Sequence, residues 1–62
     1  MNTIQQLRHH VRDIIVKHPE KRSEILDLLE LCMDEIEEGG SPAHEINLCI
    51  NDINQLIENQ EA

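Results

Sequence analysis

Apolar residues recur every three or four positions through the first part of the chain, as they do on one face of an α-helix. This spacing predicts a helix over residues 3–17, with Val16 off its apolar stripe. Thr3 is expected to cap the helix, because Gln6 stands three residues later, as a capping box requires. The stripe consists of Ile4, Leu7, Val11, Ile14 and Ile15.

A second helix is expected over residues 19–38, between two breaks in the pattern. Pro19 disfavours helical geometry at His18 and suits the first turn of a new helix. A kinked continuation of the first helix is the alternative. Gly39 can adopt the left-handed conformation that ends helices. The apolar residues cover roughly 220° of the circumference at 100° per residue. They are Ile25, Leu26, Leu28, Leu29, Leu31, Cys32, Met33 and Ile36.

A third helix is predicted over residues 42–59. Ser41 at the N-cap and Pro42 at the first helical position form a strong start signal. Leu48 falls near the face opposite the apolar stripe. That stripe consists of Ile46, Cys49, Ile50, Ile53, Leu56 and Ile57.

The short link between the second and third helices predicts their arrangement. Gly39-Gly40-Ser41-Pro42 leaves room only for an antiparallel hairpin. In that register Leu29 faces Ile53, and the other levels are also apolar on both sides. We therefore expect one all-α domain over residues 1–62, in which a short N-terminal helix precedes an antiparallel helical hairpin.

The wide apolar arc of the second helix indicates that a second subunit covers part of it. One neighbouring layer covers a much narrower stripe, so some leucines are expected to stay bare in a monomer. Two-fold pairing of two hairpins gives a helical bundle. We expect an obligate homodimer whose interface contains Leu26, Leu28, Leu31 and Met33.

The composition limits the class of protein. A chain of 62 residues without Phe, Tyr or Trp must build a small aliphatic core. No segment approaches the ~20 apolar residues of a membrane span. The start, Met1-Asn2-Thr3-Ile4, lacks the pattern of a signal peptide. We therefore expect a cytoplasmic protein with reduced cysteines and no membrane partner.

The charge of the chain is strongly asymmetric. The net charge is −8, yet all five Lys and Arg residues lie within the first 22 positions. Such asymmetry suggests an electrostatic partner or a basic segment folding against an acidic one. An acidic face that only keeps the protein soluble is the plainer alternative. The candidate partner-binding residues are Arg8, Arg12, Asp27, Glu30, Asp34, Glu37 and Leu48.

The acidic arc of the second helix, continued by Glu45, Asp52 and Glu58, allows a second reading. Carboxylates spaced along a helix can imitate a phosphate backbone and block a nucleic-acid-binding protein. Direct binding to nucleic acid is not expected, because that interaction needs net positive charge.

No arrangement of residues indicates catalysis, a cofactor or a metal. Cys32 and Cys49 fall on one level of the hairpin, where two small apolar residues can fill a tight layer or form a cross-link on oxidation. Neither has a second cysteine at zinc-site spacing, and no two histidines stand four positions apart. No nucleophile, phosphate-loop or metalloprotease motif occurs. We expect no catalytic, cofactor-binding or metal-binding residues.

The segment from His18 to Leu56 resembles small acidic accessory proteins from the early region of lambdoid bacteriophages. The resemblance is carried by Pro19-Glu20-Lys21, by the run from Leu31 to Pro42 (LCMDEIEEGGSP) and by His44-Glu45-Ile46. It implies a short, acidic, helical and often dimeric protein that adjusts host physiology through protein contacts in the host cytoplasm. It carries over no catalytic residues.

The sequence thus favours a non-enzymatic homodimeric module that modulates a host or phage protein. The alternatives are an acidic DNA mimic and a purely structural element that assembles only with itself.

Overall fold

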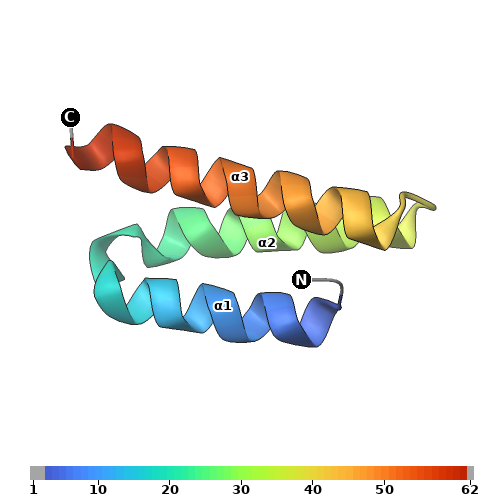
Figure 1. The fold of residues 1–62 in the computed structure, drawn as a ribbon, viewed down its shortest axis with the longest axis horizontal. Helices are drawn as coiled ribbons and strands as arrows, with labels where there is room; N and C mark the ends of the chain where they lie inside the picture. The colour runs from blue at the N-terminus through green and yellow to red at the C-terminus, as the bar shows by residue number, and fades with distance from the viewer. Residues whose placement is uncertain (1–2, 62) are drawn as a thin grey trace.

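The computed structural model describes residues 3–61, so Met1, Asn2 and Ala62 of the domain expected over 1–62 lie outside the described residues. Helices account for nearly all of the described chain, which confirms the all-α class (Figure 1). The elements are α1 (Ile4–Lys17), a short 3₁₀ turn η1 (Pro19–Lys21), α2 (Arg22–Glu37) and α3 (Pro42–Glu61).

Local hydrogen bonds fix both ends of α1. The Thr3 side-chain oxygen accepts a hydrogen bond from the backbone N–H of Gln6 at 3.1 Å, so Thr3 caps the helix. At the other end, the N–H of His18 donates to the carbonyl of Ile14 at 2.8 Å. Pro19 follows directly and cannot continue the helix, because it lacks a backbone N–H.

The chain passes from α1 to α2 through the 3₁₀ turn, so the α-helix begins at Arg22 rather than at Pro19. The N–H of Lys21 donates to the carbonyl of His18 at 3.0 Å, which closes this tighter turn. Lys21 pairs with Glu24 at 3.6 Å, but a partly exposed pair of this kind adds little stability.

Two glycines end α2. Gly39 has a φ of 110°, which favours glycine, and its N–H donates to the carbonyl of Ile36 at 3.1 Å. The N–H of Gly40 donates to the carbonyl of Glu35 at 2.8 Å. Together these bonds form a Schellman motif, the usual end of a helix that stops at glycine. A Cβ atom on Gly40 would lie only 2.8 Å from the Glu35 carbonyl oxygen, so this position also requires glycine.

The third helix starts where the sequence predicts and ends later. The Ser41 carbonyl accepts the first helical hydrogen bond from the N–H of Glu45 at 2.9 Å. This bond places Ser41 at the N-cap and Pro42 in the first turn. The helix continues to Glu61, beyond the expected end at residue 59. No glycine or proline follows Pro42 to stop it.

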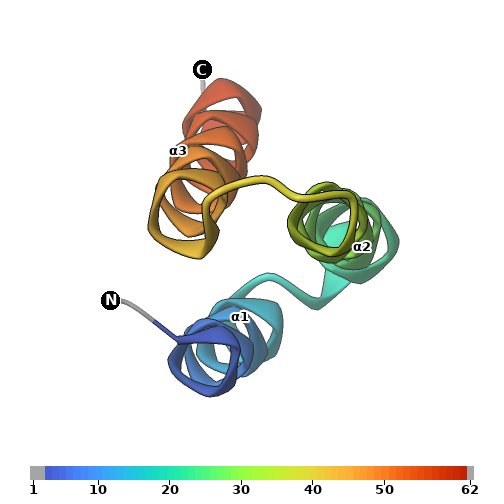
Figure 2. The same cartoon turned by 90° about the vertical axis from the view of Figure 1, so that its right-hand side faces the viewer.

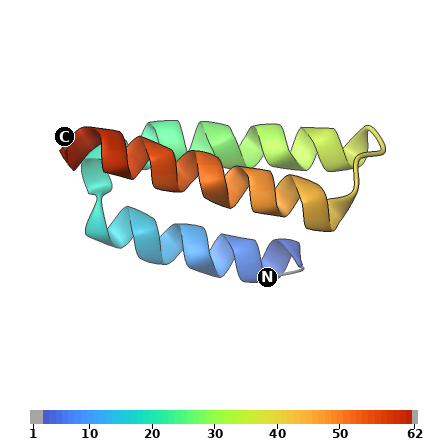
Figure 3. The ribbon, with the colours of Figure 1, turned by 45° about the horizontal axis from the view of Figure 1, so that its top comes forward.

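The three helices lie side by side, and each runs antiparallel to the one before it (Figures 1 and 3). Viewed from one end they occupy the corners of a triangle, and α2 packs most extensively against α3 (Figure 2). The body measures 34 × 19 × 18 Å. Over the part of the chain that the structure describes, no helix has the length and apolar character to cross a membrane.

All three helices contribute fully buried residues to one core. Ile25 of α2 and Ile53 of α3 are completely shielded from solvent, as is Leu7 of α1. Around them lies a shell of half-buried aliphatic side chains that includes Leu29. Among the described residues no polar or charged side chain is buried, so the core is held mainly by the burial of apolar side chains. Its buried residues are Leu7, Val11, Ile25, Cys32, Ile46, Cys49 and Ile53.

Replacing Ile53 with Ala should lower the free energy of unfolding by about 2–5 kcal/mol, because the truncated side chain leaves a cavity where three helices meet. Val16→Ala is the control, since Val16 is 80% exposed and its loss should change stability by less than about 0.5 kcal/mol. Urea titration followed by circular dichroism measures both. A loss below about 1 kcal/mol for Ile53→Ala would contradict this core.

Candidate functional site

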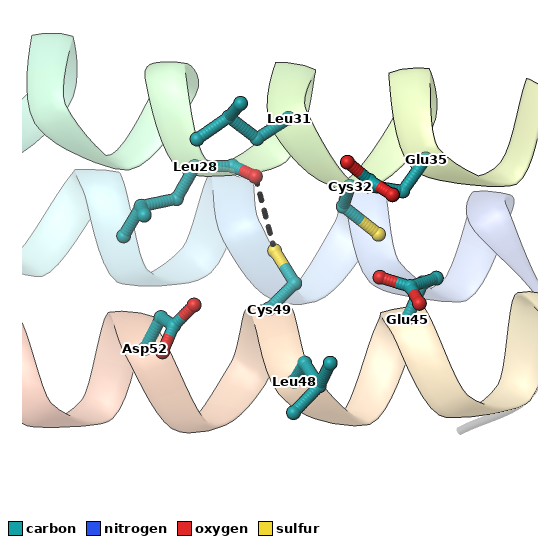
Figure 4. A pocket seen from close by; sticks show the side chains of 8 residues that line it. All are labelled: Leu28, Leu31, Cys32, Glu35, Glu45, Leu48, Cys49 and Asp52. Atoms are coloured by element: carbon teal, nitrogen blue, oxygen red, sulfur yellow. Dashed lines mark hydrogen bonds between the residues drawn. The ribbon is translucent and has the colours of Figure 1, made fainter. Parts of the chain in front are cut away.

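A groove of about 220 Å³ runs between α2 and α3. Figure 4 shows it with α1 behind the two helices, so the groove lies on the side of the bundle away from α1. Its walls combine leucines, two thiols and carboxylates. They are formed by Leu28, Leu31, Cys32 and Glu35 of α2 and by Glu45, Leu48, Cys49 and Asp52 of α3.

The two walls use the same spacing. On α2 the groove residues follow positions 28, 31, 32 and 35, and on α3 they follow positions 45, 48, 49 and 52. Steps of three and four residues keep side chains on one face of a helix. Because the helices are antiparallel, Glu35 and Glu45 lie at one end of the groove, whereas Leu28 and Asp52 lie at the other (Figure 4).

Two leucines on opposite walls of the groove remain open to solvent. Leu31 is 59% exposed and Leu48 is 43% exposed, while Leu28 is half-buried beside them. The buried thiols of Cys32 and Cys49 form the floor between the walls. The result is an apolar strip that crosses from one helix to the other without a cover. Clusters of exposed apolar side chains of this kind mark interaction sites.

The groove is negative on both sides of this strip. Glu35, Glu45 and Asp52 line it, and none of its lining residues is Lys or Arg. The sequence has no Lys or Arg after Arg22, so neither α3 nor the rest of α2 brings a cation to these walls. A concave surface lined by one sign of charge concentrates oppositely charged partners.

The two cysteines at the floor are free and poorly reactive. The Cys49 Sγ donates to the carbonyl of Leu28 at 3.7 Å (Figure 4). Burial raises the pKa of Cys49 to about 12, and the neighbouring Cys32 thiol adds to the effect. Burial also raises the pKa of the Cys32 thiol. At neutral pH both groups are protonated thiols, which are weak nucleophiles.

The residues expected at a dimer interface do not share one face. Leu28 and Leu31 line the groove, but Met33 lies toward α1, where its sulfur accepts a hydrogen bond from Arg8 Nη2 at 3.9 Å. Each residue of an α-helix advances by roughly 100° around the axis, so residues two apart are separated by roughly 200°. Leu31 and Met33 therefore point in nearly opposite directions. Leu26 is half-buried and is not a groove residue.

The structure separates the expected partner-binding residues in the same way. Leu48 lines the groove, whereas Arg8 is engaged with Met33 and Arg12 is exposed on α1. The carboxylates expected on the outer side of α2 are all exposed and lie outside the groove. They are Asp27, Glu30, Asp34 and Glu37.

Sequence reasoning assigned Glu45 and Asp52 to a solvent-facing acidic arc and missed Glu35 altogether. The signal that could have found the groove is the matched spacing of three and four residues on the two helices, with leucines and carboxylates in both. Hydrophobic periodicity alone did not reveal it, because it draws attention to the core face.

No group of three or more His, Cys, Asp or Glu side chains lies close enough to hold a metal ion within the described residues. Comparison of the chain with protein-family models, curated proteins and solved structures finds no match. The resemblance to lambdoid bacteriophage accessory proteins therefore stays a prediction.

The pKa of Cys49 predicts how stability depends on pH. The unfolded chain loses the thiol proton near 9.0, but the folded chain keeps it until about 12. The stabilising contribution is complete below pH 9.0 and disappears as the pH rises toward 12, because the unfolded state then binds fewer protons than the folded state. Urea titrations between these values should show the free energy of unfolding falling with pH.

Cys49→Ala is the matched variant for this measurement. Burial also raises the pKa of the Cys32 thiol, so the comparison is between the slopes of the two proteins, and the variant should show the shallower one. Equal slopes would contradict a buried, protonated Cys49 thiol.

Proposed function

We propose that the protein is a non-enzymatic module that binds another protein through the groove between α2 and α3. The observation that carries the proposal is the exposure of Leu31 and Leu48 on opposite walls of one groove. Covering these leucines removes apolar surface from water, which is the main driving force of protein association. Neither side chain is needed to fill the core of the isolated chain.

The size of the groove supports a protein over a small molecule as its occupant. Drug-sized ligands occupy sites of about 300–1,000 Å³ that enclose most of their surface. The groove measures about 220 Å³ and has exposed side chains on both walls. Such a surface suits a few anchor side chains of a partner helix, as in the helix-in-groove mode of recognition.

The chemistry of the groove supports binding over catalysis. Its nucleophile candidates are thiols with raised pKa values, the opposite of the lowered pKa of an activated cysteine. In the setting that the resemblance to lambdoid bacteriophage accessory proteins implies, the bound partner is a host or phage protein in the host cytoplasm.

A homodimer is the second candidate, and the same exposed leucines favour it. Two-fold pairing through the groove would place Glu35, Glu45 and Asp52 of one copy against the same residues of the other. Like charges brought together across an interface oppose binding. The charge of the groove therefore favours a different protein, and the homodimer stays a prediction that the mass of the protein in solution tests.

The acidic DNA mimic is supported by a separate observation, the exposure of the outer carboxylates of α2, including Asp27 and Asp34. It requires the outer side of α2, not the groove, to meet the partner. Its binding should weaken steeply with salt, whereas burial of Leu31 and Leu48 is less sensitive to salt.

A photo-cross-linking residue in place of Leu48 should form an adduct with the partner protein in cell extract, and the same residue in place of Val16 should not. Val16 is the matched position because it is an exposed apolar residue on α1, away from the groove. Mass spectrometry identifies each adduct. Adding Leu31→Ser to the position-48 protein should remove the adduct, because it takes away the opposite wall.

Equal labelling at both positions, or an adduct unaffected by Leu31→Ser, would contradict the groove as the binding face. An adduct of twice the 7.2 kDa chain mass would support the homodimer instead.

A further inference from the structure

We propose that the occupant of the groove is a cationic amphipathic helix of another protein, with aliphatic anchors flanked by Lys or Arg. The inference rests on the proposed function and adds the chemistry of the partner. It follows from the apolar strip and from the carboxylates that border it.

The apolar strip sets the form of the occupant. The groove follows α2 from Leu28 to Glu35 and α3 from Glu45 to Asp52, which is two turns of each helix, or about 10 Å. A helix laid along it presents side chains at i, i+3 or i+4, and i+7 over the same length. Two or three aliphatic side chains at those positions can contact Leu31 and Leu48.

The carboxylates set the charge of the occupant. Glu35 stands on one wall and Glu45 on the other at one end of the groove, and Asp52 stands at the opposite end (Figure 4). A helix in the groove therefore has carboxylates on both flanks. Lys or Arg beside its anchors can reach them, and charges of opposite sign speed association and fix the register.

The protein's own basic helix does not meet this requirement. The apolar face of α1 is turned into the core, where Leu7 and Val11 are buried. Of its large apolar residues only Val16 is among the exposed ones, and Asp13 adds a negative charge to the solvent side. A second copy of the chain would thus bring only one exposed apolar side chain through α1, and carboxylates through its own groove. A different protein can match both the apolar strip and the negative charge of the groove.

The probe is a labelled synthetic helical peptide of about four turns, roughly 14 residues, with Leu at i, i+3 and i+7 and Lys on both flanks. A second peptide carries Glu in place of every Lys. Fluorescence anisotropy should show saturable one-to-one binding of the Lys peptide and none of the Glu peptide. Binding of both peptides with similar affinity, or of neither, would overturn the proposal.

Two triple variants with the same change in charge locate the interaction. The groove variant should weaken binding of the Lys peptide roughly tenfold, and the outer variant should change it by less than about threefold. Circular dichroism checks that both stay helical. The groove variant carries Glu35→Gln, Glu45→Gln and Asp52→Asn. The outer variant carries Asp27→Asn, Glu30→Gln and Asp34→Asn.

Failure of this inference can be told apart from failure of the proposed function. If the two triple variants bind the Lys peptide equally but Leu31→Ser abolishes binding, the groove is the binding face and the cationic partner is wrong. If neither the groove variant nor Leu31→Ser weakens binding, both proposals are overturned.

Discussion

The core has to be closed with Ile, Leu, Val and Cys, because the chain contains no Phe, Tyr or Trp. Aliphatic side chains are small, so helices must approach closely and on three sides before residues such as Ile25, Ile46 and Ile53 are fully buried. This requirement packs α1, α2 and α3 against one another at the corners of a triangle and demands short, well-defined links. The caps at Thr3 and Gly39 and the break at Pro19 serve that arrangement.

A core that small cannot use all the apolar residues that α2 carries. Its arc is wide enough to face α1 through Met33, the centre through Ile25 and α3 through Leu28. Leu31 lies beyond the last of these contacts and stays exposed to water, and Leu48 is exposed on the opposite wall of the groove, on α3. The groove is thus a consequence of how the bundle closes. The leucines that folding does not bury form the exposed apolar surface of the groove.

The ends of the helices could be predicted from the sequence. The rotation of each helix about its axis relative to its neighbours could not. The cap at Thr3, the glycine end at Gly39 and the start at Pro42 depend on neighbouring residues alone. The 3₁₀ turn after His18 could not be predicted, because Pro19 is equally compatible with the first turn of an α-helix. Periodicity gave the apolar arc of α2 but not the neighbour that covers each part of it.

Because the covering neighbour could not be predicted, the residues expected at one dimer interface lie on two faces of α2. Leu31 lies in the groove, and Met33 lies beside Arg8. Glu35 was overlooked for the same reason. Its position in the groove depends on how α2 and α3 are turned toward each other, which brings it level with Glu45. A pattern read along one helix carries no information about that angle.

The central claim is that Leu31 and Leu48 are available for binding because folding does not need them. The most direct test is the unfolding of a Leu31→Ser, Leu48→Ser double variant beside the unmodified protein, at micromolar and at hundredfold higher concentration. The account predicts a free energy of unfolding within about 1 kcal/mol of the unmodified protein and midpoints independent of concentration. A loss of several kcal/mol, with an unmodified protein whose midpoint rises with concentration, would contradict it by placing both leucines in the core of an obligate dimer.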